Sequence, residues 1–411
     1  MKETIYSARW VFPIDQPPIQ GGFIRIVDDR IVEVNSLRNA SLRVANTHDL
    51  GDVAVLPKLV NAHTHLEFSD CRQPIGDPGM SLTKWIARVI QARGRCSQSE
   101  RESNVARGLE ESFRAGVGYI GDIATTPTRY PESPVGVVSF AEVLGLSQDR
   151  SDERFASALA HHASLDKTAS VRFAVSPHAP YSTPTPLVER CVDLAVKQDV
   201  PIAMHLAETP EERQLLETGG GGFADSLRNA GVWRDGLFPH VGSQPIRAII
   251  RQLSAAPRVL LIHGNDLQTS EIEELAGFPK MSVVFCPRTH AFFQHPPHPV
   301  ADLLRAGVSV ALGTDSRASN PDLSVWREVQ FLLQRRGDLE PADVLKMATA
   351  SGGDALYGRQ LAVERNIGRI GPGPGGIDSF GVVPTMADRL DDVWRDFAAN
   401  ELLCINIASR P

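Results

Sequence analysis

Several features that mark other classes of protein are missing from this sequence. Its five cysteines are scattered along 411 residues and form no Cys-x-x-Cys pair, which argues against a disulfide framework or a thiolate zinc site. No uninterrupted apolar run approaches a membrane span, and the first residues lack the apolar core of a signal peptide. We therefore expect a cytoplasmic protein with no membrane segment, in which imidazole and carboxylate groups hold any metal.

The charge balance excludes a further class of protein, the nucleic-acid binders. The formal net charge is −7, from 42 basic and 49 acidic residues, so the chain lacks the basic excess of a nucleic-acid binder. Hydrophobic residues make up 42% and charged residues 22%, as in ordinary globular proteins. We expect a small-molecule substrate, no nucleic-acid partner, and enough chain for more than one structural domain.

From about residue 56 the sequence alternates between short, β-branched apolar runs and longer helical patterns. The apolar runs are 59–62, 117–123, 135–143, 171–176, 201–206, 258–263, 282–286 and 308–312. The helical patterns include 99–115, 152–167, 185–198, 210–230, 299–306 and 322–335. Apolar strands that alternate with helices indicate a covered parallel sheet, and eight such units predict a (β/α)₈ TIM barrel. A doubly wound sheet is the competing topology, but no Gly-x-Gly-x-x-Gly follows an early strand.

Both ends of the chain depart from this rhythm. Residues 1–55 show short strand patterns, including two that flank a tight hairpin at 28–30. After about 357 the helical pattern fades, a Gly/Pro-rich stretch follows at 368–376, and strands are expected at 382–383 and 402–407. We expect a barrel domain at 56–356 and a small flanking β-sandwich domain built from both chain ends, 1–55 and 357–411.

Residues with the chemistry of metal ligands stand where predicted strands end. His63 and His65 close the first strand, and residues i and i+2 of a strand point to the same face. His205 closes the fifth strand and Asp315 follows the eighth, which neighbours the first in a closed barrel. These four side chains can therefore meet at one metal ion. For each residue alone, a hydrogen-bonded core histidine or a turn aspartate is the alternative interpretation.

Two further residues suit proton transfer at such a site. Glu208 lies three residues past His205, where a carboxylic acid can move protons between water and a substrate nitrogen. His263 ends the sixth strand and can stabilise the oxygen derived from that water. A first-turn carboxylate favoured by the helix dipole is the alternative for Glu208.

Five segments together resemble the amidohydrolase superfamily of metal-dependent barrel hydrolases. They are PKLVNAHTHLE (57–67), SPHAPYS (176–182), MHLAE (204–208), LIHG (261–264) and LGTDSRASN (312–320). The chain is most similar to its deaminase and chlorohydrolase branch, particularly to aminofutalosine and adenosine-type deaminases. The resemblance implies a single divalent metal, since the fourth strand ends without the lysine that binuclear members carry. Zinc is favoured and iron is the alternative, because both accept imidazole and carboxylate ligands.

The resemblance also implies roles for individual residues. The metal ligands would be His63, His65, His205 and Asp315, the proton shuttle Glu208, and the groups that orient the attacking hydroxide His263 and Asp315. The substrate-binding residues would be His178, Arg288, His290, Trp85 and Ser319. Arg288 suits a substrate carboxylate or, equally, a local one. Trp85 suits a stacking surface or plain helix core.

The implied reaction is hydrolytic deamination of an aminated heterocycle, such as the adenine of aminofutalosine, by a metal-bound hydroxide. One alternative keeps this machinery but releases chloride or an alkylamine from a triazine, or opens a cyclic amide. A second alternative, of another class, is a catalytically silent binding protein on the same fold. Relatives often form dimers or larger assemblies, so a homodimer or higher homo-oligomer is compatible with the resemblance.

Overall fold

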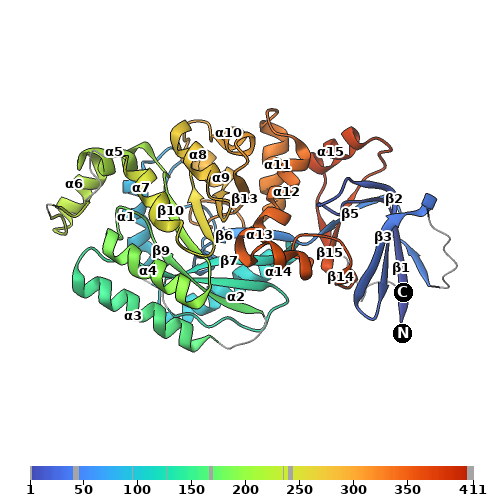
Figure 1. The fold of residues 1–411 in the computed structure, drawn as a ribbon, viewed down its shortest axis with the longest axis horizontal. Helices are drawn as coiled ribbons and strands as arrows, with labels where there is room; N and C mark the ends of the chain where they lie inside the picture. Colours follow the sequence, from blue (N-terminus) through green and yellow to red (C-terminus); the bar gives the residue numbers. More distant parts are fainter. Residues whose placement is uncertain are drawn as a thin grey trace. The chain divides into compact units, whose positions relative to one another are not determined.

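The computed structural model describes residues 2–39, 46–94, 96–125, 127–165, 170–234, 236–238 and 244–404. The chain divides into two compact units, one of residues 1–61, 111–119 and 324–411, the other of residues 62–110 and 120–323. Two sheets organise the described residues (Figure 1). Each sheet is built from a different part of the chain, as expected from the change in sequence pattern near residue 56.

Eight parallel strands form the predicted barrel. They are β6 (Leu59–Thr64), β7 (Val117–Ala124), β8 (Gly136–Val143), β9 (Val171–Pro177), β10 (Ile202–Leu206), β11 (Val259–His263), β12 (Met281–Phe285) and β13 (Ser309–Leu312). The strands are neighbours in chain order from β6 to β13. A parallel bridge between Thr64 and Asp315 joins the two ends of this order. The (β/α)₈ barrel is confirmed, and the sequential strand order excludes the doubly wound alternative.

The helices follow the predicted alternation. They are α1 (Leu82–Arg93), α2 (Gln98–Arg114), α3 (Gln148–Ser164), α4 (Thr185–Gln198), α5 (Pro210–Thr218), α6 (Gly221–Asn229), α7 (Pro245–Leu253), α8 (Thr269–Ala276), α9 (Pro287–Phe292), α10 (Val300–Arg305), α11 (Val325–Arg335), α12 (Pro341–Met347), α13 (Ala350–Tyr357), α14 (Arg359–Glu364) and α15 (Leu390–Ala399). No helix separates β7 from β8 among the described residues of that connection.

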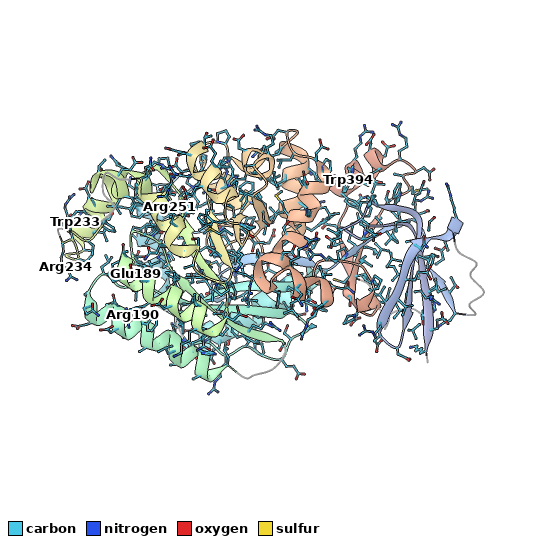
Figure 2. The ribbon with its side chains drawn as sticks, viewed as in Figure 1. Glu189, Arg190, Trp233, Arg234, Arg251 and Trp394 are labelled. Carbon is cyan, nitrogen blue, oxygen red and sulfur yellow. The ribbon has the colours of Figure 1, made fainter. Side chains whose placement is uncertain are left out.

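Helices α3 and α4 cover the outer side of β8 and β9 (Figure 1). The buried face of α4 includes Leu187, Val188 and Cys191, at the spacing of one helical face. Arg190, labelled on α4 in Figure 2, lies on the other face and pairs with Asp152 of α3 at 2.6 Å. The apolar stripe therefore fixes the helix on the sheet, while the ion pair joins neighbouring helices at the surface.

The second sheet is mixed and draws on both chain ends, which confirms the flanking β domain. Its strands are β1 (Glu3–Val11), β2 (Ile19–Val27), β3 (Arg30–Ser36), β4 (Thr47–Asp49), β5 (Val53–Pro57), β14 (Gly373–Pro374), β15 (Phe380–Pro384) and β16 (Leu403–Cys404). Antiparallel pairing of β5 with β15 brings the two ends together. Asp28 and Asp29 at φ 46° and 58° make the predicted hairpin between β2 and β3.

An aromatic cluster stabilises this terminal unit. Trp394, labelled in Figure 2, lies with its ring centroid 5.3 Å from that of Phe12 and 5.3 Å from that of Phe397. The Phe12 and Phe397 rings are 5.1 Å apart. Helix α15, which carries two of these rings, therefore contributes much of the apolar surface that the sheet buries.

Three expectations from the sequence were wrong. The segment 210–230 is not one helix, because Gly219 and Gly221 adopt positive φ (67° and 84°) and separate α5 from α6. The helical pattern does not end near 357, since α14 and α15 lie beyond it. The stretch 368–376 is not wholly irregular, because β14 pairs with β3. Residues 405–407 of the expected last strand lie outside the described residues, and the expected domain boundaries stay a prediction.

No helix in the described ranges is both long enough and apolar enough to cross a membrane.

Candidate metal centre and active site

The side chains proposed as metal ligands meet at the carboxyl ends of the barrel strands. Nε2 of His63 lies 3.5 Å from Oδ1 of Asp315, and Nε2 of His65 lies 3.6 Å from the same oxygen. Ligand atoms of these three residues lie within 4.8 Å of one another, as do those of His63, His205 and His263. The structure therefore brings all four proposed ligands together around His63, with His263 beside them.

The surroundings of His63 fit a metal ion. The residue is 1% exposed, and neither ring nitrogen has a hydrogen-bond partner among the described residues. Buried polar atoms nearly always have a bonding partner. A buried ring nitrogen without one, close to other possible ligand atoms, is therefore suited to bind a metal ion. Three imidazoles and a carboxylate are a donor set that zinc and iron accept.

Hydrogen bonding sets the orientation of His205. Its Nδ1 lies 2.9 Å from the main-chain oxygen of His178. A carbonyl oxygen only accepts, so Nδ1 carries the proton and Nε2 keeps its lone pair for a metal. Burial, followed by the neighbouring His178, lowers the pKa of His205 to about 4. The ring is therefore neutral at physiological pH, the form that binds metal.

The backbone at the barrel mouth is strained. Ala207, His263 and Asp315 have φ of 53°, 72° and 56°, in the left-handed region that residues with a Cβ rarely adopt. Each is held by hydrogen bonds: N–H of Asp315 donates to the oxygen of His63 at 3.1 Å, and Nε2 of His298 donates to the oxygen of His263 at 2.9 Å. Such strain persists where surrounding contacts hold it, as at functional sites.

Glu208 lies beside this cluster as a buried acid. One of its carboxylate oxygens is 3.5 Å from Nε2 of His263. Burial, with help from the charges of Asp315 and Glu212, holds the pKa of Glu208 well above its ordinary value. Burial therefore favours the protonated form of this side chain, which can deliver its proton to a group in the pocket.

The proposed substrate-binding residues are placed less uniformly. Oγ of Ser319 donates to Oδ2 of Asp315 at 2.7 Å, so it orients that carboxylate. Trp85 packs edge-on against Phe293, with ring centroids 5.3 Å apart, and its Nε1 donates to a main-chain oxygen. Arg288 pairs with both carboxylate oxygens of Asp322, at 2.6 and 2.9 Å. The local carboxylate, one of the two partners considered for Arg288, is therefore present.

The remaining two candidates, His290 and His178, differ in how close they lie to the metal cluster. Nε2 of His290 donates to the oxygen of Pro296 at 2.9 Å, in a local contact. His178 lies next to the metal cluster, with its ring centroid 5.1 Å from that of His205. His178 and Ser319 thus contact a proposed ligand, and the substrate roles of all five candidates stay predictions.

Three buried carboxylates at or near this site were missed from the sequence. They are Asp122, Glu142 and Glu212, all under 8% exposed. Glu142 is the single charged residue of strand β8, and Glu212 completes a Thr-x-x-Glu helix start with Thr209. Both signals were readable in the sequence as buried or capping acids.

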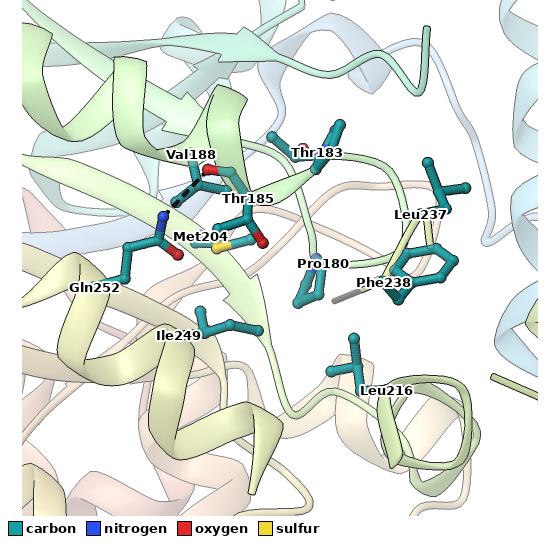
Figure 3. Close-up of a pocket in the computed structure, with 11 residues that line it drawn as sticks. Pro180, Thr183, Thr185, Val188, Met204, Leu216, Leu237, Phe238, Ile249 and Gln252 are labelled. Carbon is teal, nitrogen blue, oxygen red and sulfur yellow. Dashed lines mark hydrogen bonds between the residues drawn. The ribbon is translucent and has the colours of Figure 1, made fainter. Parts of the chain in front are cut away.

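An apolar pocket lies elsewhere in the unit that contains residues 120–323 (Figure 3). Met204 and Ile249 are part of its lining, and Nε2 of Gln252 donates to the oxygen of Thr185 at its edge, at 3.1 Å. Met204 and His205 are adjacent on β10, so their side chains point to opposite faces. The pocket therefore lies on the helix-covered side of the strand and not at the metal cluster.

Comparisons with known proteins identify the family. Residues 54–373 match the amidohydrolase family. The chain is 31% identical over 329 residues to the aminodeoxyfutalosine deaminase of Deinococcus radiodurans, which covers 76% of this chain and 75% of that protein. It is 28% identical over 369 residues to a 5-methylthioadenosine/S-adenosylhomocysteine deaminase of Syntrophobacter fumaroxidans, which covers 85% and 78%.

A solved structure shows the same fold. The aminofutalosine deaminase of Helicobacter pylori, in complex with methylthio-coformycin, matches with a TM-score of 0.81 at 21% identity over 97% of each chain. The family match spans most of the chain and includes every residue of the proposed metal cluster. This chain belongs to the amidohydrolase family.

Proposed function

We propose that this amidohydrolase deaminates the adenine ring of a nucleoside by hydrolysis. The observation that carries the proposal is the buried carboxyl group of Glu208, 3.5 Å from Nε2 of His263, beside a cluster of imidazoles and one carboxylate whose ligand atoms lie close together. Similarity to an aminodeoxyfutalosine deaminase and to a 5-methylthioadenosine/S-adenosylhomocysteine deaminase supports an adenine nucleoside as the substrate class.

The proposed metal ligands are His63, His65, His205 and Asp315, with zinc favoured over iron. A divalent ion held there would lower the pKa of a water molecule toward neutrality, which makes it nucleophilic at physiological pH. The chain's own contribution to the ion is a rigid set of donors: His205 is aimed by a main-chain oxygen and Asp315 by Ser319.

Glu208 and His263 act on the substrate side in this proposal. Water adds its oxygen to the ring carbon that bears the amine, while Glu208 gives its proton to the adjacent ring nitrogen. The carbon–nitrogen bond then breaks, and the amine takes one proton of the water and leaves as ammonia. The other water proton returns to Glu208, and an oxo group remains on the ring. His263, 3.5 Å from Glu208, stabilises charge that develops on the incoming oxygen.

The finer assignments stay predictions. Arg288 already pairs with Asp322, so a substrate carboxylate would have to share that guanidinium. A single metal ion, the cytoplasmic location and a homo-oligomeric state also rest on the sequence alone.

Ammonia release from the metal-loaded protein tests the proposal. The substrates are adenosine, 5-methylthioadenosine, S-adenosylhomocysteine and aminodeoxyfutalosine, with free adenine and a chlorinated triazine as comparisons. We expect at least one nucleoside to react with kcat/KM of about 10⁴ M⁻¹s⁻¹ or more. Chloride release from the triazine with no ammonia from any nucleoside would replace the proposal with the second reaction, and no turnover at all would favour a silent binding protein.

A further inference from the structure

Glu142 is a buried acid that the proposed chemistry does not use. It lies one residue before the end of β8, opposite Ser176 of β9 in the sheet register. Ser139, three residues earlier, contacts His161 of the covering helix α3, so alternation along the strand turns Glu142 toward the barrel interior. Its side chain is 5% exposed. The carboxylate therefore lies inside the barrel mouth.

The nearest polar atom that faces Glu142 belongs to His178. Nε2 of His178 lies 4.0 Å from Oε1 of Glu142. On the other side of the ring, Nδ1 lies 2.6 Å from Oγ of Ser182, whose own hydrogen goes to the oxygen of Ala179 at 3.1 Å. Oγ must then accept from Nδ1, so Nδ1 carries the ring proton and Nε2 is a bare acceptor.

The 4.0 Å between Nε2 of His178 and Oε1 of Glu142 is too long for a hydrogen bond. No donor among the described residues makes a hydrogen bond to the Glu142 carboxylate. The cations closest to it are engaged elsewhere: Arg93 with Glu67 at 3.1 Å, and Arg154 with the oxygen of Thr125 at 3.3 Å. A buried carboxylate without donors is costly, and a ligand that brings two O–H groups removes that cost.

The charges around the gap between Glu142 and Nε2 of His178 limit which chemical group of a ligand can bind there. Burial raises the pKa of Glu142, and the charges of Arg93 and Arg154 act against that rise and disfavour a cation in the gap. The carboxyl groups of Glu67 and Glu142, which offer oxygen acceptors, disfavour an anion there. A neutral group with two adjacent hydroxyls suits both acceptors. The gap also adjoins the metal cluster, because the main-chain oxygen of the same His178 orients His205.

We propose that Glu142 and His178 bind the vicinal 2′- and 3′-hydroxyls of the substrate's ribose, which makes Glu142 a specificity-determining residue for ribonucleosides. One hydroxyl donates to the Glu142 carboxylate and the other to Nε2 of His178. The inference rests on the proposed nucleoside deaminase activity and adds the sugar subsite to it.

The test compares substrates that differ by one hydroxyl. The best adenine ribonucleoside found for the wild type is assayed beside its 2′-deoxy and 3′-deoxy analogues, with ammonia release as the readout. A site built to bind a substrate hydroxyl rejects the analogue that lacks it, so we expect kcat/KM to fall about hundredfold for each analogue. The comparison uses the wild type, and it holds whether or not a variant folds.

The variant Glu142→Gln assigns the effect to this residue. It should be about hundredfold slower on the ribonucleoside, and about as much slower on the analogue that keeps the hydroxyl bound by Glu142. On the analogue that lacks this hydroxyl it should stay within about tenfold of wild type, because that substrate has no bond to Glu142 to lose. Glu153→Gln, the same change at a 62% exposed side chain of α3, should leave all three rates unchanged.

Three outcomes count against the inference in different ways. Similar rates on ribose and deoxyribose substrates in the wild type would reject the diol subsite and leave the deaminase proposal standing. An equal loss on all three substrates in Glu142→Gln would show that Glu142 is only structural. No ammonia from any adenine nucleoside would reject the proposed function, and the sugar subsite with it.

Discussion

Glu212 holds the main chain of Glu208: Oε2 of Glu212 accepts the N–H of Glu208 at 3.1 Å, and Oε1 accepts the N–H of Ala207 at 2.9 Å. Nδ2 of Asn265 donates to the oxygen of Glu208 at 3.1 Å, on the other side of the peptide. The proposed proton donor is thus fixed at both main-chain groups. This support also stabilises the left-handed backbone of Ala207, which turns the chain from β10 toward α5.

Glu212→Gln should lower kcat by about tenfold without loss of metal. The amide keeps one acceptor but sets an NH₂ group against a main-chain N–H. It also removes a charge that raises the pKa of Glu208, so the loss of activity on the alkaline side should begin at lower pH. The pH profile of kcat/KM checks this. A uniform loss at every pH would show a purely structural role, and Glu211→Gln, one residue earlier in α5, is the control.

Glu208→Gln should retain the bound metal and lose activity by about 10²–10⁴-fold. The amide has the shape of the acid but cannot deliver its proton. Metal content by elemental analysis and ammonia release from the same preparation give the two readouts. Metal loss in this variant would instead identify Glu208 as a ligand and contradict its assignment as the proton donor.

Removal of the metal should abolish activity, and His63→Ala should prevent its recovery. Chelation followed by addition of zinc or iron should restore the wild type, because the donor set is held in place by hydrogen bonds such as that from His205 to His178. The variant should bind less than one equivalent under the same conditions. Full metal content in His63→Ala would contradict its place at the centre of the cluster.

Gly313→Ala should destabilise the protein and weaken metal binding. A Cβ at Gly313 would lie 2.8 Å from the oxygen of His63 and 3.0 Å from its Cβ, so the ligand must shift. Overpacking of this kind costs about 1–3 kcal/mol. Gly337→Ala is the matched control, since no heavy atom outside its immediate chain neighbours lies within 4 Å of a Cβ there. Thermal unfolding and metal titration of both variants measure the difference.

Asp122→Asn should flatten the pH dependence of stability. Burial, opposed by hydrogen bonds from Leu66 N–H and Tyr130, raises the pKa of Asp122 from 3.8 to about 7. The folded state therefore holds a proton that the unfolded state releases, so this group's contribution is fully present below pH 3.8 and is lost as the pH rises to 7. The slope is at most about 1.4 kcal/mol per pH unit.

The comparison with Asp122→Asn isolates this group from the buried histidines, whose lowered pKa values act in the opposite direction. Between pH 4 and 7 the wild type should lose stability relative to the variant. Denaturant unfolding of both proteins across this range gives the difference, and a constant gap would show that Asp122 does not titrate there.

The sequence alone determined the barrel and the set of residues at its mouth. Strands are recognised by apolar runs, and parallel strands that follow one another in a barrel place all their carboxyl ends on one rim. Residues as distant in sequence as His63 and Asp315 were therefore expected to be neighbours. Nε2 of His63 lies 3.5 Å from Oδ1 of Asp315. Local chemistry also decided turns, as with the hairpin at Asp28 and Asp29.

Helix ends in glycine-rich stretches were harder to predict. The run from 210 to 230 has one continuous helical pattern, yet Gly219 and Gly221 divide it. Beyond 357, helix α15 is stabilised by packing of Trp394 and Phe397 against Phe12. The contact joins residues from opposite ends of the chain, and no local pattern reports it.

Only the tertiary structure decided what each polar group at the mouth can do. It showed that Arg288 is engaged by Asp322, that His178 presents a bare nitrogen to Glu142, and that Glu212 fixes Glu208. Sequence spacing places side chains on a rim, but proton positions and pKa values depend on burial and on the nearest donors and acceptors. Those neighbours come from different strands, and only the folded chain brings them within hydrogen-bond distance.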